Sequence, residues 1–219
     1  MIPSPRRPRA LLLDFDGVVL QSAALKTRAF AEMYAGAEAA VRNAIVDYVD
    51  VNGGVSRRDK FAHIERAFFG RAGAPADLDR LAAAFRDRVF DAVVASDFVP
   101  GAERLLRAAQ GSIDLHVISG TPHEELLEIV ARRSLDRWFA SVRGSPPGKR
   151  ETFARILAER GYVSGETLAV GDALTEYEAA CALGIPFLAV VAPGTANRFP
   201  PGVPHVPTLE PVPAMVGLE

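Results

Sequence analysis

The sequence predicts an α/β protein: a doubly wound parallel-sheet (Rossmann-like) core with an inserted all-helical cap domain. Two observations lead to this prediction. Short apolar runs alternate with helical patterns over most of the chain, and one long stretch contains helical patterns alone. When helices cover both faces of a parallel sheet, its strands are buried on both sides, and their sequences are continuous apolar runs.

The predicted core strands are four short apolar runs, at 10–15, 115–119, 167–172 and 186–191. Helical periodicity marks the segments 101–110, 122–133, 149–160 and 175–183. Strands that alternate with helices in this way are typical of a doubly wound sheet. Ligands of such sheets bind at the carboxyl ends of the strands, so we expect the functional site there. One more short strand is expected near 205–206, in a tail rich in Pro and Gly.

The stretch between the first and second strands has no convincing strand pattern. Its apolar residues recur at helical spacing in four segments, 24–34, 38–49, 56–69 and 78–94. Glycine-containing turns separate these segments. We therefore predict three parts: the first strand and its loop at 1–20, a helical cap at 21–96, and the rest of the core at 97–219.

Composition limits the functions that the chain can have. The net charge is -2 over 219 residues, which gives no basic surface for nucleic acid. No apolar run is long enough to span a bilayer, and Asp14 and Asp16 interrupt the apolar run after the basic segment 1–9 too early for a signal peptide. The only cysteine, Cys181, is expected to be buried on an apolar helix face. We expect a cytoplasmic monomer or small homo-oligomer with no membrane partner.

Polar residues stand where the predicted strands end or a helix begins: Asp14 with Asp16, Ser119, Lys149, and Asp172 with Glu176. Each of these alone could be a helix cap or a solvated charge. Because the carboxyl ends of parallel strands meet at one edge of a sheet, their joint occurrence predicts a single polar site.

These motifs resemble the haloacid dehalogenase superfamily over nearly the whole chain: Asp14-Phe15-Asp16-Gly17-Val18, Ser119 after a strand, Lys149 at a helix start, and Gly171-Asp172 followed by Glu176. The resemblance implies that Asp14 is a nucleophile that forms an aspartyl phosphate. It also implies that Asp16 is the general acid and base, and that Mg²⁺ is bound by Asp14, the main-chain carbonyl of Asp16, and Asp172.

The remaining motif residues would hold the phosphoryl group. Gly17 lets the chain turn closely, Ser119 and the Gly120 amide can donate hydrogen bonds, and Lys149 supplies a positive charge. Glu176 departs from the family pattern, which commonly has Asp at this position. With its longer side chain, Glu176 is expected either to ligate the metal or to orient Lys149 or a metal-bound water.

The resemblance extends to the group that includes β-phosphoglucomutase and phosphoglycolate phosphatase. In the cap, Arg57 follows Ser56 as in a loop of β-phosphoglucomutase where an Arg holds a substrate phosphate, so Arg57 and Lys60 are expected to clamp the distal end of an anionic substrate. The alternative is a serine cap followed by solvated charges. Lys26 could also face the cleft.

The resemblance therefore implies a magnesium-dependent phosphatase that acts on a small phosphorylated metabolite, such as a sugar or sugar-acid phosphate. Family dehalogenases lack the second Asp and the metal ligands, so Asp16 and Asp172 favour phosphoryl chemistry over dehalogenation. Two alternatives remain open: a sugar phosphomutase of the β-phosphoglucomutase type, and a non-catalytic module that binds a phosphorylated ligand.

Overall fold

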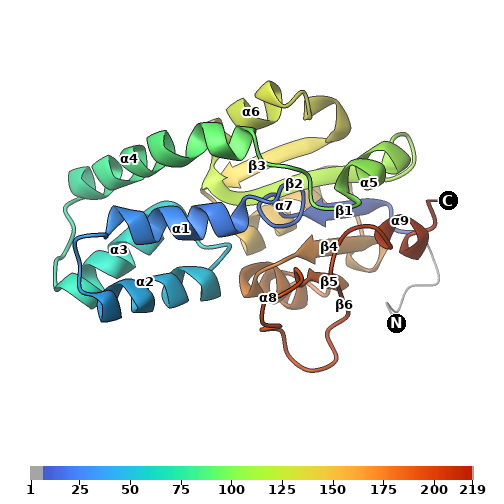
Figure 1. Cartoon of the computed structure of the whole chain (residues 1–219). Coiled ribbons are helices and arrows are strands. Elements are labelled where there is room, and N and C mark those ends of the chain that lie inside the picture. Colours follow the sequence, from blue (N-terminus) through green and yellow to red (C-terminus); the bar gives the residue numbers. More distant parts are fainter. Residues whose placement is uncertain (1–6, 219) are drawn as a thin grey trace.

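A single sheet of six parallel strands, in the order β3-β2-β1-β4-β5-β6, organises the core of the computed structural model, which describes residues 7–218 (Figure 1). The strands are β1 (Ala10–Leu13), β2 (Asp114–Pro122), β3 (Ser141–Ser145), β4 (Thr167–Gly171), β5 (Phe187–Val190) and β6 (His205–Val206). The chain starts in the middle of the sheet and builds outwards in both directions. The strand order therefore reverses between β1 and β4, and such a reversal opens a crevice at the carboxyl ends of the strands.

Helices cover both faces of this sheet, so each strand alternates between two apolar clusters. Leu11 and Leu13 of β1 belong to the cluster that contains Leu105 and Ile129, and Leu12 belongs to the cluster on the other face. The core helices are α5 (Ala102–Ala109), α6 (His123–Arg132), α7 (Lys149–Arg160), α8 (Leu174–Ala182) and the short α9 (Val212–Met215). Two 3₁₀ turns, η1 (Asp136–Trp138) and η2 (Ser164–Glu166), complete the core. The predicted doubly wound α/β core is confirmed.

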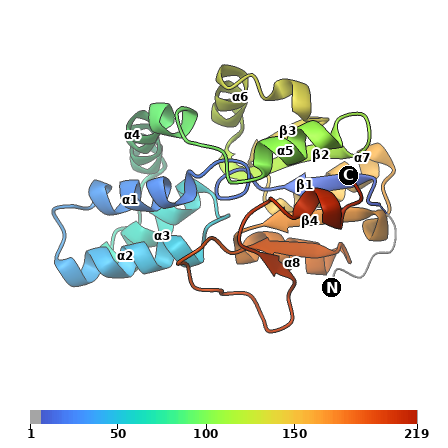
Figure 2. The same ribbon diagram turned by 45° about the vertical axis from the view of Figure 1, so that its right-hand side comes forward.

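The cap consists of α1 (Ala23–Met33), α2 (Ala39–Val51), α3 (Arg57–Phe69) and α4 (Pro75–Val94). These helices form a separate body beside the sheet in both views (Figures 1 and 2). Their common core is aromatic, because the rings of Phe30, Phe61 and Phe85 lie 4.4–6.0 Å apart. Such offset and edge-on ring pairs stabilise a core beyond the area that they bury.

The chain crosses between cap and core twice, and the two crossings lie side by side. The amide of Gln21 donates to the Asp97 carbonyl at 2.9 Å, and the amide of Val99 donates to the Val19 carbonyl at 3.0 Å. This pairing fixes where the cap begins and ends on the core, close to the loop that follows β1.

The structure differs from the sequence-based expectations at two places in the core. β3 is an additional strand at the edge of the sheet, and the half-buried, polar side chains of Ser141 and Arg143 explain why no apolar run marks it. Cys181 is exposed, which corrects the expected burial, because α8 turns Ala179 and Ala180 towards the sheet and Cys181 away from it. Most of the basic segment 1–9 lies outside the described residues. No helix between residues 7 and 218 is long and apolar enough to cross a membrane.

Candidate active site

The loop after β1 holds the first two motif residues at the sheet's reversal point. The amide of Asp14 donates to the Val170 carbonyl of β4 at 3.0 Å, so Asp14 continues the strand pairing and is held between β1 and β4. Gly17 follows with φ of 82°. A Cβ on Gly17 would overlap the carboxylate of Asp172, so both the backbone conformation and the close approach require glycine here.

Lys149 is buried at the start of α7 and contacts two carboxylates. Its Nζ lies 2.5 Å from Asp14 Oδ1 and 2.8 Å from Glu176 Oε1, and it donates to the Ile118 carbonyl at 2.5 Å. Burial alone would lower the pKa of Lys149, but the charges of Asp14 and Glu176 outweigh burial and raise it. Lys149 therefore remains a cation beside Asp14.

Glu176 lies at the start of α8 and is almost completely buried. Its Oε2 accepts a hydrogen bond from the Ala173 amide at 3.1 Å, and its Oε1 accepts one from the Thr175 hydroxyl at 3.0 Å as well as contacting Lys149. Both oxygens are thus held in place. Glu176 thus contacts Lys149, one of the groups that it is expected to orient, while its carboxylate also lies close to Asp14.

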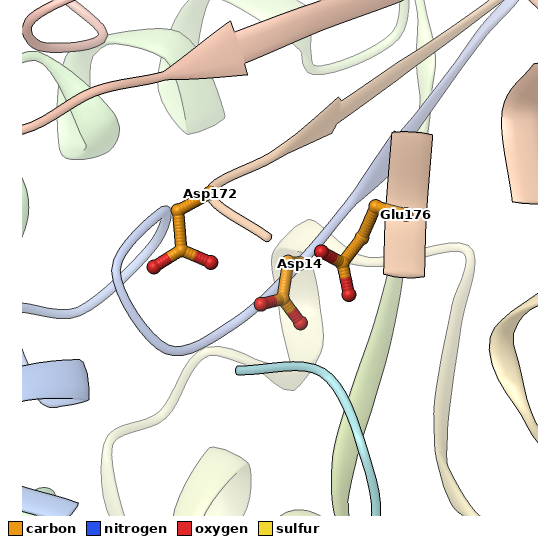
Figure 3. Close-up of side chains that lie close together, drawn as sticks. All are labelled: Asp14, Asp172 and Glu176. Atoms are coloured by element: carbon orange, nitrogen blue, oxygen red, sulfur yellow. The ribbon is translucent and has the colours of Figure 1, made fainter. Parts of the chain in front are cut away.

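Asp14, Asp172 and Glu176 form a compact acidic cluster, with one carboxylate oxygen of each within 4.8 Å of the others (Figure 3). Burial raises the pKa of Asp14 to about 6, although the charge of Lys149 lowers it. Burial and the charges of Asp14 and Glu176 raise the pKa of Asp172 well above its usual range. Buried carboxylates whose negative charges repel in this way are stabilised by a cation.

This cluster fits a divalent cation. Its three carboxylates face one ammonium group, that of Lys149, which leaves an excess of two negative charges when all are ionised. Within residues 7–218, no hydrogen bond or ion pair engages the Asp172 carboxylate. Asp14 and Asp172 could thus ligate Mg²⁺, which prefers a few carboxylate oxygens and keeps several waters. The Asp16 side chain points elsewhere, so Asp16 could contribute only its main-chain carbonyl, as expected.

Asp16 is surrounded by donors. Its carboxylate accepts hydrogen bonds from Ser22 and Lys26, both at 2.5 Å, and from Thr121 at 3.2 Å, and Ser119 lies 3.4 Å away. Burial raises the pKa of this carboxyl, but the charge of Lys26 and the hydrogen bonds hold it below its usual range. Asp16 is therefore ionised in this arrangement.

Sequence reasoning did not identify two of these donors, Ser22 and Thr121. Lys26 bridges the two parts of the site, because its Nζ also lies 2.7 Å from Thr121 Oγ1. Thr121 follows Ser119 by two residues, so both lie on one face of the extended chain. This two-residue spacing could have indicated that Thr121 shares the site with Ser119. No pattern in the sequence indicates that Ser22 lies beside Asp16.

A glycine loop of the cap, Gly53-Gly54, reaches the core at this site. A Cβ on Gly120 would lie 2.8 Å from the Gly54 carbonyl, and a Cβ on Gly54 would overlap Thr175 and Glu176. Lys60 of α3 donates to the Gly53 carbonyl at 2.9 Å. Burial and the nearby charge of Lys26 lower the pKa of Lys60 to about 8. The cap therefore closes directly over the motif residues.

The second expected cap residue, Arg57, does not present a free charge. Ser56 is the N-cap of α3, as the simpler interpretation proposed, and its hydroxyl accepts a hydrogen bond from the Asp59 amide at 3.2 Å. Arg57 at the first helical position instead pairs with Glu125 of α6 at 2.8 and 2.7 Å. Arg57 and Lys60 nonetheless line the same cavity as Asp14 and Asp172.

This cavity has a volume of about 540 Å³ and is bounded by both the cap and the core. Motif residues form one end: Asp14, Asp16, Gly17, Ser119, Gly120 and Asp172. Cap residues that include Phe30, Phe85 and Arg57 form another part of the wall. Lys149 and Glu176 do not line the cavity themselves, and Lys149 contacts it through Asp14. A cavity of this size suits a small metabolite.

Comparison with solved structures gives the same architecture. Over 93% of this chain and 95% of that chain, the protein is 20% identical to CbbY from Rhodobacter sphaeroides, solved in complex with phosphate, with a TM-score of 0.74. A predicted phosphoglycolate phosphatase from Haemophilus somnus matches with a TM-score of 0.73 and 15% identity, over 97% of this chain and 99% of that chain. A putative β-phosphoglucomutase from Thermotoga maritima matches with a TM-score of 0.68 and 20% identity, over 95% and 98%. At these identities, the likeness shows the fold alone.

The sequence itself matches a protein-family model, that of the haloacid dehalogenase-like hydrolases, over residues 8–184. A search of curated proteins found no match. The family match covers most of the chain and includes all the motif residues at the strand ends. The chain therefore belongs to the haloacid dehalogenase-like hydrolases and is an enzyme, as its motifs predict.

Proposed function

We propose that this enzyme is a magnesium-dependent phosphatase that hydrolyses a small phosphorylated metabolite through an aspartyl phosphate on Asp14. One observation carries the proposal: Asp14 and Asp16 open into the same cavity, with Asp172 beside them and Lys149 bonded to Asp14. A nucleophile, a proton-transfer group and a carboxylate that could ligate a metal thus line one small space, and a lysine behind the nucleophile offsets its charge. This set is what transfer of a phosphoryl group requires.

Asp14 attacks phosphorus, and the ester oxygen leaves with the proton that Asp16 donates. Because Asp16 is ionised in the free site, that proton arrives when substrate binds, since a phosphate dianion beside the carboxylate raises its pKa. Asp16 then takes a proton from water, which hydrolyses the aspartyl phosphate and regenerates Asp14.

The other motif residues hold the phosphoryl group during these steps. Lys149 remains charged and offsets the negative charge of Asp14 as the phosphoryl group approaches. Ser119 and the Gly120 amide offer donors from the end of β2. When bound by Asp14, Asp172 and the Asp16 carbonyl, Mg²⁺ supplies the charge that lets a carboxylate approach a phosphate dianion.

The test measures phosphate release from a panel of sugar and sugar-acid phosphates, with Mg²⁺ and with chelator. We expect magnesium-dependent release from at least one member. Asp14→Asn should lower kcat about 10³-fold or more, because it removes the nucleophile, with an unchanged circular dichroism spectrum. Asp47→Asn, which makes the same change at an exposed cap residue, should behave as the unmodified enzyme. Near-normal turnover by Asp14→Asn would reject the assignment of the nucleophile.

A sugar phosphomutase is the second candidate. The cavity is bounded by cap and core together, and closer approach of the cap to the core over such a cavity can shield an aspartyl phosphate from water. Product analysis with glucose 1-phosphate separates the two reactions, because a phosphatase yields free phosphate and a mutase yields glucose 6-phosphate. The non-catalytic binding module is not retained, because the family is one of enzymes and the nucleophile, the second Asp and the Lys are all present.

A further inference from the structure

Arg57 of the cap lines the cavity, and its guanidinium is held mainly by one carboxylate, that of Glu125. Arg57 also donates a hydrogen bond to the Ala82 carbonyl at 3.3 Å. Its two terminal nitrogens lie 2.8 and 2.7 Å from the two oxygens of Glu125, and both side chains are buried. The guanidinium also lies 4.7 Å from the centre of the Phe85 ring. Bidentate pairs of this kind fix both the position and the orientation of the guanidinium.

The pairing cancels the charge of Arg57. A second phosphate or carboxylate on a substrate could use this charge only by displacing Glu125, which would leave a buried carboxylate without its partner. Breaking a buried ion pair in this way is strongly unfavourable. Arg86 cannot replace Arg57 as the partner of Glu125, because it is engaged by Glu128. Its distance to a Glu128 oxygen is 2.6 Å, whereas its distance to the nearest Glu125 oxygen is 3.9 Å.

One nitrogen of the Arg57 guanidinium makes no hydrogen bond to the described residues. This nitrogen, Nε, is buried, and Arg57 lines the cavity. A buried donor without a partner is costly, so a bound ligand that supplies an acceptor gains from meeting it. Because the Arg57–Glu125 pair is neutral as a unit, the acceptor that suits Nε is an uncharged oxygen.

Two other cations that line the cavity are also paired with carboxylates. In the described chain, Lys26 pairs with Asp16, and Arg198 pairs with Asp50. Lys60 instead donates to a main-chain carbonyl, and the charges of Asp16 and Asp172 act on it, so it belongs to the phosphoryl end of the cavity. Among these cations, only Lys60 has no carboxylate partner within residues 7–218, and it lies near the phosphoryl end of the cavity. No unpaired cation of the described wall is therefore left to bind a second anionic group of the substrate.

We propose that Glu125 determines substrate specificity: by holding Arg57 it excludes a second anionic group and leaves Arg57 to donate to a neutral hydroxyl or carbonyl oxygen. The substrates are therefore phosphate monoesters with one anionic group, such as sugar phosphates, and neither bisphosphates nor sugar-acid phosphates. This inference rests on the proposed function of the site. It replaces the expected role of Arg57 as a clamp on a distal anion.

The test is a binding experiment that needs no turnover. Calorimetry in the presence of Mg²⁺ measures the affinity of ribose 5-phosphate and ribose 1,5-bisphosphate for the Asp14→Asn protein, with and without Glu125→Gln. We expect the Asp14→Asn protein to bind the bisphosphate no more tightly than the monophosphate. Glu125→Gln frees the charge of Arg57 and should tighten bisphosphate binding about tenfold or more, with less than about a threefold change for the monophosphate.

Glu124→Gln is the matched control, because Glu124 is the exposed neighbour on the same helix and its replacement removes the same charge. It should change neither affinity. Tighter binding of the bisphosphate than of the monophosphate by the Asp14→Asn protein itself would overturn the proposal, and so would no gain in bisphosphate affinity with Glu125→Gln. Equal changes for both probes would also overturn it, since they would mean that the pair only fastens the cap to the core. If Glu125→Gln does not fold, the ratio measured without it still decides.

Because Asp14→Asn cannot turn over, the outcome does not depend on the rate of hydrolysis. If the protein releases no phosphate from any substrate but Glu125→Gln changes the two affinities as expected, the proposed function is rejected and the role of Glu125 in specificity is retained. The reverse result would keep the phosphatase and reject the role of Glu125.

Discussion

Lys26 is a residue of the cap that contacts Asp16 in the core. It stands in the first cap helix, yet its Nζ lies 2.5 Å from the Asp16 carboxylate and 2.7 Å from the Thr121 hydroxyl of the core. Its charge is the largest influence that lowers the pKa of Asp16 against the effect of burial. Lys26 therefore influences the protonation of the carboxyl that, in the proposed mechanism, both gives and takes a proton.

We expect Lys26→Met to lower kcat about 10²-fold, in the range that general acid–base groups contribute. Without the ammonium group, burial dominates and the pKa of Asp16 rises. Asp16 must be ionised to take the proton from water, so the acidic limb of the kcat profile should move to higher pH. The measurement is kcat against pH for this variant and for Lys26→Arg, which keeps the charge. The same profile in both variants would show that the charge of Lys26 does not control Asp16.

The residues of the site differ in how far the sequence reveals them. Asp14, Asp16, Ser119 and Asp172 follow predicted strands, and the parallel sheet brings such positions together, so the sequence places them in one site. Glu125 has no such signal. Its role depends on α6 of the core lying against α3 and α4 of the cap, a contact between segments that are 68 residues apart in the chain.

At the scale of elements, the connection between α2 and α3 is the part of the cap that must fit the core most closely. It carries Gly54, which contacts both Gly120 after β2 and the start of α8. Its neighbour Gly53 accepts the hydrogen bond from Lys60. Three segments of the chain thus meet at a point where no side chain can be accommodated.

Gly54→Ala tests this fit. The added Cβ would overlap Thr175 and Glu176, so the loop must move away from the site, and we expect kcat/KM to fall about 10- to 100-fold through misplacement of groups around the substrate. The stability of the fold should change little, because the loop can shift without opening the apolar core. Gly36→Ala, in another cap loop with nothing within 4 Å of an added Cβ, is the control. Full activity of Gly54→Ala would mean that the observed closeness of loop and core is not needed for turnover.

The elements themselves were predictable where burial is uniform. The strands β1, β4 and β5 are buried at every position, so the sequence of each is largely an apolar run. β3 lies at the edge of the sheet with mostly half-buried residues, and its sequence carries no comparable pattern. The four cap helices were predicted from their periodicity, but periodicity contains no information about which core helix the cap meets.

At the scale of the whole molecule, charge is distributed unevenly. The chain carries a net charge of only -2, yet the acidic cluster places three carboxylates beside one lysine in a buried region. Folding brings these groups together, whereas the unfolded chain keeps them apart in water. The stability of the fold is therefore linked to proton binding at the site and, under the proposed function, to Mg²⁺ binding there.

The direction of this linkage follows from the pKa values. Burial raises the pKa of Asp14 from 3.8 to about 6 in the folded protein, so the folded state holds the proton more tightly than the unfolded state does. The resulting stabilisation is present below about pH 4 and is lost as the pH rises through about 6, by an amount on the order of 3 kcal/mol. The raised pKa of Asp172 acts in the same direction.

A cation that binds the ionised cluster should reverse this loss. Mg²⁺ stabilises the folded state only to the extent that it binds there, and it competes with protons for Asp14 and Asp172. We therefore expect the rise in Tm that Mg²⁺ causes to be larger at about pH 8 than at about pH 5. Thermal unfolding with Mg²⁺ and with chelator at both values measures it. Asp172→Asn should remove most of the difference, because it deletes a ligand and one of the repelling charges, while Asp47→Asn on the exposed face of α2 should keep it. A Tm rise of equal size at both pH values would mean that the ion does not bind at this cluster, and the chemistry proposed for Asp14 would then need another source of positive charge.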